Sequence, residues 1–538
     1  MASNEKSRGD LDVNSANEEG LRTETRLTRR GFNVTLIGGL ALAAGGIPLI
    51  APKPAASAPT RGGTLRVATH TQSTNDTFDS TKYIYTNDYI RATSVYNTLT
   101  VLDEKSQAQP ELAESFEPNA TATRWVFKIR KGVKFQDGAP LAMDDIIFSI
   151  MRHKDPKLAS SAKPLVANIT EVKADGPDSI AIELASPDVD LPIMIGIFQF
   201  TIVKNGTTDF SNPVGTGPFK VKEFKPGVRC VMVRNDGYWK EGKPYVDQIE
   251  LFHVLDPVAR VNALLSGDAQ MVTDLQGTAI DQVANSSSAR VFTTHCPRYT
   301  SIQGAADRAP SNNLDLRMAI TYLMDRKRLL DTVMKGQGLI ANDHPIMSTS
   351  PLYDEGLVQR TLDLDKAKFH FGKSGIGSSK IEIDVSDAAP FSVEIGQLLQ
   401  REAAQIGLNL ELKRDPADSY WNTVAGQRPF TAINFNPRPT YNMLLSLAWK
   451  SGVPWNFSHY SDSELDNLID KARATLDKTE RTHTYYQIEK IIYDAGYLML
   501  PCFISYVDGI SNKVQGLVPV PVGNLSGFNF ADRAWLET

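Results

Sequence analysis

Residues 381–412 read IEIDVSDAAPFSVEIGQLLQREAAQIGLNLEL, and this stretch indicates the fold class more directly than any other. Ile381, Ile383 and Val385 alternate with polar residues, as in a half-buried strand. The same alternation returns at positions 408, 410 and 412. Between the two, apolar residues recur at helical spacing: Phe391, Ile395, Leu398, Leu399 and Ile406. A strand–helix–strand unit favours two parallel strands joined by a right-handed crossover, so the sequence predicts an α/β protein.

Three other segments extend this pattern to both sides. Residues 124–135 alternate apolar and polar side chains and predict a pair of strands. Residues 316–330 carry a one-sided apolar stripe and predict a single helix. Ser461 followed by Glu464 resembles a capping box at the start of another helix.

Size and charge narrow the class of protein. With 538 residues, the chain exceeds what one core usually organises, so we expect two or more lobes. The formal net charge of −5, without a basic tract, argues against nucleic-acid binding. No nucleophile elbow, zincin, P-loop or dinucleotide-binding motif occurs in a suitable context, so we expect no enzyme and no cofactor.

The N-terminus has the order of regions found in an export signal. Arg29 and Arg30 stand in TRRGF, a weakly apolar run follows over 32–50, and small residues close the segment at 55–58. Adjacent arginines before a mildly apolar region are typical of the twin-arginine route, which exports folded proteins. We therefore expect residues 1–58 to be a removable leader and the protein to be periplasmic.

The cysteines and histidines do not form a recognisable metal site. Cys230, Cys296 and Cys502 are the only cysteines, and an odd count leaves one thiol over if a disulfide forms. The sequence cannot choose the pair, although a Cys296–Cys502 bridge is one option. The eight histidines are scattered and no CxxC occurs, so we expect no metal site.

Several stretches taken together resemble the extracellular solute-binding proteins of ABC importers, in particular the peptide/nickel-type family 5. The resemblance covers nearly the whole chain after the leader, and its markers stand in the family's order. They are GGTLRVA (62–68), PELAESFE (110–117), VFKIRKGVKFQDGAPLAMDDIIFSI (126–150), NPVGTGPFKV (212–221), NDGYW (235–239), LRMAITYLMDR (316–326) and ELDNLIDKAR (464–473).

This resemblance implies a two-lobed periplasmic binding protein whose lobes close on a ligand, with an extra subdomain inserted in the first lobe. The chain should cross to the second lobe near 299–304 and return near 502–507. The expected division assigns 59–93, 212–303 and 505–538 to lobe I, 94–211 to the inserted subdomain and 304–504 to lobe II. The implied partners are a small-molecule or short-peptide ligand and a membrane permease with its ATPase. We expect a monomer.

Ligand identity should depend on lobe II and the hinge, above all on NFNPRPT (434–440). Peptide-binding relatives often carry an acid in the aligned stretch, where it pairs with the ligand's α-amino group. Here Asn434, Asn436 and Arg438 stand instead, and a guanidinium can hold a carboxylate in a bidentate manner. The alternative is that Arg438 only pairs with a neighbouring acid. Further candidates for the pocket are Tyr299, Trp421, Tyr441, Trp449 and Trp455.

The function expected from these features is capture of a peptide-like or amino-acid-derived solute, carboxylate-bearing and opine-like, for import. The sequence leaves open an ordinary dipeptide or oligopeptide, with nickel or a metal chelate as a more distant option. It also leaves open a periplasmic sensor or chaperone that presents peptides to a partner other than a permease.

Overall fold

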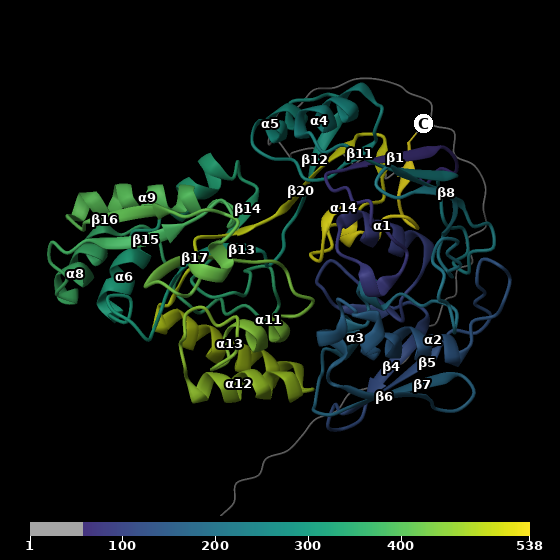
Figure 1. Cartoon of the computed structure of the whole chain (residues 1–538), viewed down its shortest axis with the longest axis horizontal. Helices are drawn as coiled ribbons and strands as arrows, with labels where there is room; N and C mark the ends of the chain where they lie inside the picture. The colour runs from purple at the N-terminus through teal and green to yellow at the C-terminus, as the bar shows by residue number, and fades with distance from the viewer. Residues whose placement is uncertain (1–57, 538) are drawn as a thin grey trace, which may run out of the picture. The chain divides into compact units, whose positions relative to one another are not determined.

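The computed structural model describes residues 58–537 (Figure 1), and all but the last residue of the expected leader, Arg29 and Arg30 included, lie outside the described residues. Within 58–537, two large sheets and one smaller sheet organise the chain. This arrangement is the mixed α/β fold that the sequence predicts. None of the helices in this range is both long enough and apolar enough to cross a membrane.

Lobe I is built on a seven-stranded sheet. Its strand order is β12-β20-β11-β1-β10-β9-β8, with β1 parallel to both β10 and β11. The strands are β1 (Thr64–Thr69), β8 (Phe219–Lys225), β9 (Arg229–Arg234), β10 (Gln248–His253), β11 (Met271–Val272), β12 (Ala289–Thr294) and β20 (Tyr506–Ser511). The main helices are α1 (Thr86–Val95), α4 (Pro257–Ser266) and α5 (Thr278–Ala284). The short segment α14 (Asn524–Gly527) is a turn in which Leu525 and Ser526 have left-handed backbone angles. A two-stranded sheet of β21 (Val514–Gln515) and β22 (Trp535–Leu536) lies near the C-terminus.

The inserted subdomain has its own antiparallel sheet, with the order β4-β5-β7-β6. Its strands are β4 (Ala113–Pro118), β5 (Arg124–Ile129), β6 (Ile169–Ala174) and β7 (Ser179–Leu184), with α2 (Met143–Met151) and α3 (Leu191–Met194) beside them. A hairpin of β2 (Thr100–Leu102) and β3 (Ala108–Pro110) precedes this sheet. Only the first half of the strand pair expected over 124–135 is a strand. The second half forms a turn closed by the bridge between Lys134 and Pro140.

Lobe II is built on the second large sheet, ordered β14-β19-β13-β17-β15-β16, with β18 also paired to β13. The strands are β13 (Tyr299–Gly304), β14 (Gly338–Ile340), β15 (Ile381–Val385), β16 (Leu410–Arg414), β17 (Phe430–Phe435), β18 (Leu498–Met499) and β19 (Cys502–Ile504). Strands β15 and β16 run parallel and are joined by α9 (Ser392–Ile406), so the strand–helix–strand prediction is confirmed.

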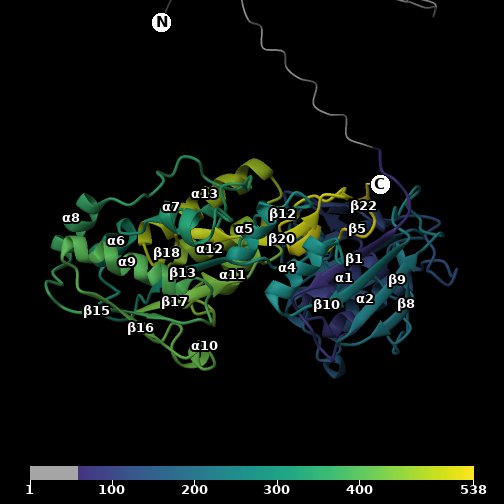
Figure 2. The same cartoon turned by 90° about the horizontal axis from the view of Figure 1, so that it is seen from above.

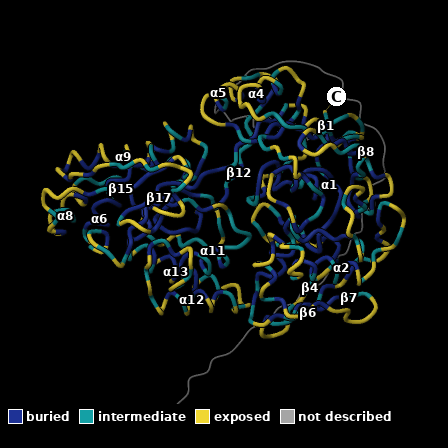
Figure 3. The backbone as a smooth tube through the Cα atoms, in the orientation of Figure 1, coloured by how far each residue is buried: buried dark blue, intermediate teal, exposed yellow. Residues whose placement is uncertain are grey.

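Helices cover both faces of the lobe II sheet, which explains why its central strands are buried (Figure 3). One face packs against α6 (Leu314–Tyr322), α8 (Leu364–Ser374) and α9. The other packs against α11 (Tyr441–Ala448), α12 (Ser463–Ala474) and α13 (Lys478–Ala495), as Figure 1 shows. The short α10 (Tyr420–Thr423) precedes β17. Burial of apolar side chains on both faces is the main stabilising contribution here.

Two details of the predicted helices were wrong. The helix expected over 316–330 is interrupted: α6 ends at Tyr322, and Asp325 accepts a hydrogen bond from the backbone N–H of Arg328. That cap starts a new helix, α7 (Arg326–Arg328), which continues as the π-helical turn Leu329–Val333. The cap of α12 is Asp462 and not Ser461, because the carboxylate of Asp462 accepts from the N–H groups of Glu464 and Leu465.

Candidate ligand-binding site

The chain crosses between the two large sheets twice, and the two crossings lie side by side (Figure 2). The first runs from β12 to β13 through residues 295–298, and the second runs from β19 to β20 through Ser505. The expected boundary between 303 and 304 falls at the end of β13, whereas the change of sheet falls between Thr294 and Tyr299.

Hydrogen bonds tie the two crossings together. His295 Nδ1 and Ser505 Oγ are 2.8 Å apart, and the N–H of Ile504 donates to the carbonyl of Arg298 at 2.7 Å. The thiol of Cys296 donates to the Ile504 carbonyl, so it is not in a disulfide. All three cysteines are free and buried, and the Cys296–Cys502 bridge is absent from the structure. The crossings form a two-strand hinge, and the first residue of β13 is Tyr299.

Arg438 lies in the loop between β17 and α11, and no carboxylate in residues 58–537 forms an ion pair with it. Its guanidinium lies over the ring of Trp455, 5.0 Å from the centroid. Its Nε is buried and has no hydrogen-bond partner among the described residues. Burial lowers the pKa of the guanidinium below its ordinary value. The alternative that Arg438 serves a neighbouring acid therefore has no partner to support it in this part of the chain.

Two further polar atoms near Arg438 are also buried without a partner in the described chain. They are the hydroxyl of Tyr299 and the indole Nε1 of Trp449. Tyr299 and Trp449 pack in the same core cluster of lobe II. Burial raises the pKa of Tyr299, while the nearby Trp449 indole and the Arg438 charge act in the opposite direction, although the indole meets no hydrogen-bond geometry to the hydroxyl. Each can donate a hydrogen bond. Since buried polar groups are normally satisfied, three unsatisfied donors in one place indicate a site for an acceptor.

The other predicted site residues have different roles in this region. Asn434 lies on β17, and its Nδ2 donates to the Tyr299 carbonyl at 2.9 Å, so it ties two strands together. Asn436 is exposed and makes no side-chain hydrogen bond to residues 58–537. Tyr441 begins α11, and its hydroxyl accepts from the N–H of Met347 at 3.4 Å. Trp421 and Trp455 are 39% and 42% exposed, so both present ring surface to solvent.

A cavity opens beside Arg438 and Tyr441 and is walled by both lobes. It encloses about 630 Å³ of empty space, including space open to solvent. Lobe II contributes Arg438–Tyr441 and residues of α13, lobe I contributes the β2–β3 turn and Asp190, and Pro297 lies at the hinge. The sequence did not single out the lobe I wall, because no motif marks it. A cavity walled by both lobes is one that lobe closure can act upon.

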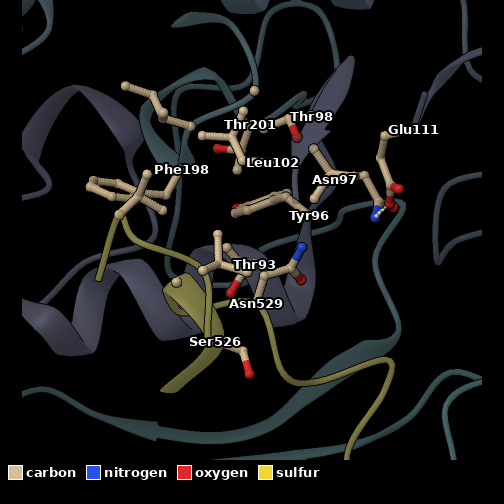
Figure 4. Close-up of a pocket in the computed structure, with 16 residues that line it drawn as sticks. Thr93, Tyr96, Asn97, Thr98, Leu102, Glu111, Phe198, Thr201, Ser526 and Asn529 are labelled. Carbon is tan, nitrogen blue, oxygen red and sulfur yellow. Dashed lines mark hydrogen bonds between the residues drawn. The ribbon is translucent and has the colours of Figure 1, made fainter. Parts of the chain in front are cut away.

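A second cavity, shown in Figure 4, lies within lobe I and has a different character. Its walls come from the end of α1, the β2 region, residues 196–201 and residues 520–529. The side chains of Asn97 and Glu111 on its wall are already hydrogen-bonded to each other at 2.8 Å. Because no residue of lobe II lines this cavity, hinge motion does not open or close it. We therefore place the candidate site at the cavity beside Arg438.

Metal binding has no support in the described part of the chain. Residues 58–537 contain no group of three or more His, Cys, Asp or Glu side chains placed to hold an ion. The buried cysteine thiols are poor ligands as they stand, because burial raises the pKa of Cys296 to about 11 and that of Cys502 to about 12.

Comparison with known proteins gives one family. The sequence model described as bacterial extracellular solute-binding proteins, family 5 Middle, matches residues 107–457. The probable D,D-dipeptide-binding periplasmic protein DdpA of Escherichia coli K12 is 24% identical, over 78% of this chain and 83% of its own length. The nickel-binding periplasmic protein of the same strain is 26% identical, over 81% and 89% respectively.

Solved structures of binding proteins have the same overall fold as this chain. The periplasmic binding protein AgaA in complex with agropinic acid, from A. tumefaciens R10, has a TM-score of 0.69 and 23% identity, covering 88% of this chain and 99% of that one. HbpA2 from Haemophilus parasuis has a TM-score of 0.79 at 20% identity, covering 88% and 100%. At these identities the likeness concerns the fold alone.

Proposed function

This chain belongs to family 5 of the bacterial extracellular solute-binding proteins, and from that premise we propose that it is the periplasmic substrate-binding component of an ABC importer. Its ligand is a peptide-like or amino-acid-derived solute that carries a carboxylate, as opines do. The closed protein delivers this ligand to a membrane permease and its ATPase. The protein binds its cargo without covalent chemistry and acts as a monomer.

The observation that carries the proposal is the trio of unsatisfied donors around Arg438. Arg438 Nε, the Tyr299 hydroxyl and Trp449 Nε1 lack partners among residues 58–537. A partly buried guanidinium without a counter-ion is costly, and a carboxylate would neutralise it while accepting hydrogen bonds from all three groups. The ring of Trp455 under the guanidinium fixes its orientation for such a contact.

The mechanism is a shift of the hinge equilibrium. A ligand that contacts both lobes binds the closed state better than the open state and so increases its population. The hinge is suited to this motion because, within residues 58–537, the chain passes between the two sheets only at 295–298 and at Ser505. These two crossings are tied to each other through His295 and Ser505. The lobes can therefore rotate without disturbing either sheet.

An ordinary dipeptide or oligopeptide is the second candidate, since its C-terminal carboxylate would also satisfy Arg438. Segment 434–440 contains no acid to hold a peptide's α-amino group, which favours a ligand recognised by its acidic end. We also propose export by the twin-arginine route, on the strength of Arg29 and Arg30.

The test is mass spectrometry of the solute that co-purifies with protein secreted by its own host. The proposal expects an amino-acid-derived compound with at least one carboxylate. A neutral or purely cationic ligand would overturn the assignment of Arg438. Turnover of the bound compound would overturn the binding-protein assignment itself.

A further inference from the structure

The cavity beside Arg438 carries more positive charge than its own acids can balance. Its ionisable wall residues are Lys105, Asp190, Arg438 and Arg481. Asp190 and Arg481 neutralise each other, because Nη2 of Arg481 donates to both carboxylate oxygens at 2.7 and 2.8 Å. Lys105 and Arg438 form no ion pair with any acid in residues 58–537. Two positive charges are therefore left over, one on each lobe.

The position of Lys105 is fixed by the turn that carries it. Lys105 lies in the turn between β2 and β3, where Oδ1 of Asp103 accepts from the N–H groups of Lys105 and Gln107 at 2.9 and 2.8 Å. The other oxygen of Asp103 accepts from Nε2 of Gln109 at 2.7 Å. Asp103 is thus occupied in holding the turn. The neighbouring Glu104 and Lys105 are both exposed and form no ion pair with each other in the described residues, so the Lys105 ammonium is available to a ligand at the cavity wall.

The remaining wall is largely apolar. It includes Ile193 from lobe I and Met347, Leu352 and Leu444 from lobe II. Apolar walls with a few charged groups fix the orientation of a ligand and exclude water from its charged ends. The arrangement suits a molecule with an apolar middle and an acidic group at each end.

We infer that the ligand carries two acidic groups, one held by Arg438 of lobe II and the other by Lys105 of lobe I. This inference rests on the proposed function and narrows its ligand class to dianions. With two like charges on facing walls, closure around a neutral or singly charged solute brings the two cations together with at most one of them paired. A dianion removes that penalty and draws the lobes together, so the second acid selects the ligand through closure.

Two isosteric probes test the inference on the purified secreted protein. N-acetylglutamate has two carboxylates, and N-acetylglutamine has one carboxylate and an amide of the same shape. Isothermal titration should give the dicarboxylate an advantage of about tenfold, as expected for one added charge-assisted contact. In Lys105→Met the two probes should bind with about equal affinity, since neither can then make the contact to Lys105. Equal affinity of the wild type for both probes, or binding of neither, would overturn the inference.

Lys131→Met is the matched control, because Lys131 is an exposed turn lysine whose partner is Asp178, and it does not line the cavity. It should keep the full preference for the dicarboxylate. The co-purified solute separates the two proposals. A monocarboxylate overturns the role of Lys105 and leaves the proposed function standing, whereas a solute without any carboxylate overturns both.

Discussion

Arg473 of α12 donates to the carboxylate of Asp188 in the inserted subdomain, with Nη2 and Nε at 3.0 and 3.3 Å from Oδ2. The backbone N–H of Val189 donates to the carbonyl of Arg473 at 3.0 Å, and the Asp190–Arg481 pair lies beside them. These contacts join the two lobes away from the hinge at His295 and Ser505. They therefore stabilise a closed arrangement in addition to anything that a ligand contributes.

Removing one of these contacts should shift the protein toward open forms. In Arg473→Gln the Asp188 carboxylate, only 8% exposed in its side chain, loses its ionic partner in the closed state and regains water on opening. We expect a larger radius of gyration by small-angle scattering and affinity for the co-purified ligand reduced about three- to tenfold. The Asp190–Arg481 pair is left intact so that the charge of the cavity does not change.

Arg414→Gln is the control for that substitution. Arg414 is 63% exposed in its side chain, pairs with Asp387 inside lobe II and touches neither lobe I nor the cavity. It should change neither the radius of gyration nor the affinity. Equal behaviour of the two variants would mean that the contact at Asp188 does not bias closure.

Substitution of Arg438 should abolish most ligand stabilisation. Arg438→Gln keeps hydrogen-bonding capacity but removes the charge, and we expect affinity to fall by about 10²-fold or more, the range for loss of a buried charge-assisted contact. Thermal-shift titration with the co-purified ligand measures this, because a ligand that binds only the folded protein raises its melting temperature. The same Arg414→Gln control should retain the full shift. An undiminished shift in Arg438→Gln would remove Arg438 from the site.

Tyr299→Phe separates a ligand-binding hydroxyl from a structural one. The hydroxyl of Tyr299 has no partner in the described chain, so its removal should leave the stability of the ligand-free protein unchanged or slightly higher. Affinity for the ligand should fall by about fivefold or more if the hydroxyl donates to it. Guanidinium denaturation and isothermal titration report the two effects separately.

Tyr420→Phe is the matched comparison for Tyr299→Phe. The hydroxyl of Tyr420 donates to the carbonyls of Asp384 and Ala432, at 3.1 and 2.9 Å. Its loss should destabilise the protein by about 1–2 kcal/mol, because buried acceptors lose their donor, without changing affinity. A reversal of the two patterns would mean that Tyr299 contributes to the fold and not to the ligand.

A buried pair in lobe II makes stability depend on pH. His344 Nδ1 lies 3.3 Å from Oε2 of Glu489, and both side chains are fully buried. Burial raises the pKa of Glu489 to about 8 and lowers the pKa of His344 to about 4. Between these values both groups are neutral, so the contact is not an ion pair at neutral pH.

The sign of the effect follows from proton linkage. Glu489 keeps its proton in the folded state up to about pH 8, whereas in the unfolded chain it ionises near pH 4.3, so its contribution to stability is lost as pH rises. Between about pH 6.5 and 8 this group should lower the free energy of unfolding by about 2 kcal/mol. His344 acts in the opposite direction only below about pH 6.5, where the unfolded chain takes up its proton.

Glu489→Gln should remove this part of the pH dependence. Urea denaturation at the two pH values should give a smaller difference for the variant than for the wild type, whatever its absolute stability. Glu480→Gln, an exposed substitution in the same helix, should keep the wild-type difference. An unchanged difference in Glu489→Gln would mean that Glu489 is ionised in the folded protein at neutral pH.

Local patterns in the sequence were sufficient to predict individual strands and helices whose apolar residues follow a regular spacing. The unit at 381–412 is confirmed as β15, α9 and β16, since strand alternation and helical spacing follow from which face of each element is buried. The prediction of a single helix over 316–330 was wrong because the apolar stripe continues through the interruption between α6 and α7. The cap at Asp325 that ends the pattern is a local hydrogen bond and not a change of polarity.

For the site, the sequence determined the residue types, and the tertiary structure decided what they can do. Arg438 without an acid in segment 434–440 is visible in the sequence and suggests an anionic ligand. Two further facts depend on tertiary packing: no acid elsewhere in residues 58–537 pairs with Arg438, and the donors of Tyr299 and Trp449 beside it are also unsatisfied. The fold brings these segments together from far apart in the sequence, since the Asn434 side chain donates to the carbonyl of Tyr299, more than 130 residues away. The role of Lys105 is further from any motif, because a turn lysine is usually solvated. It becomes informative only where the fold places it on a cavity wall opposite a second unpaired cation.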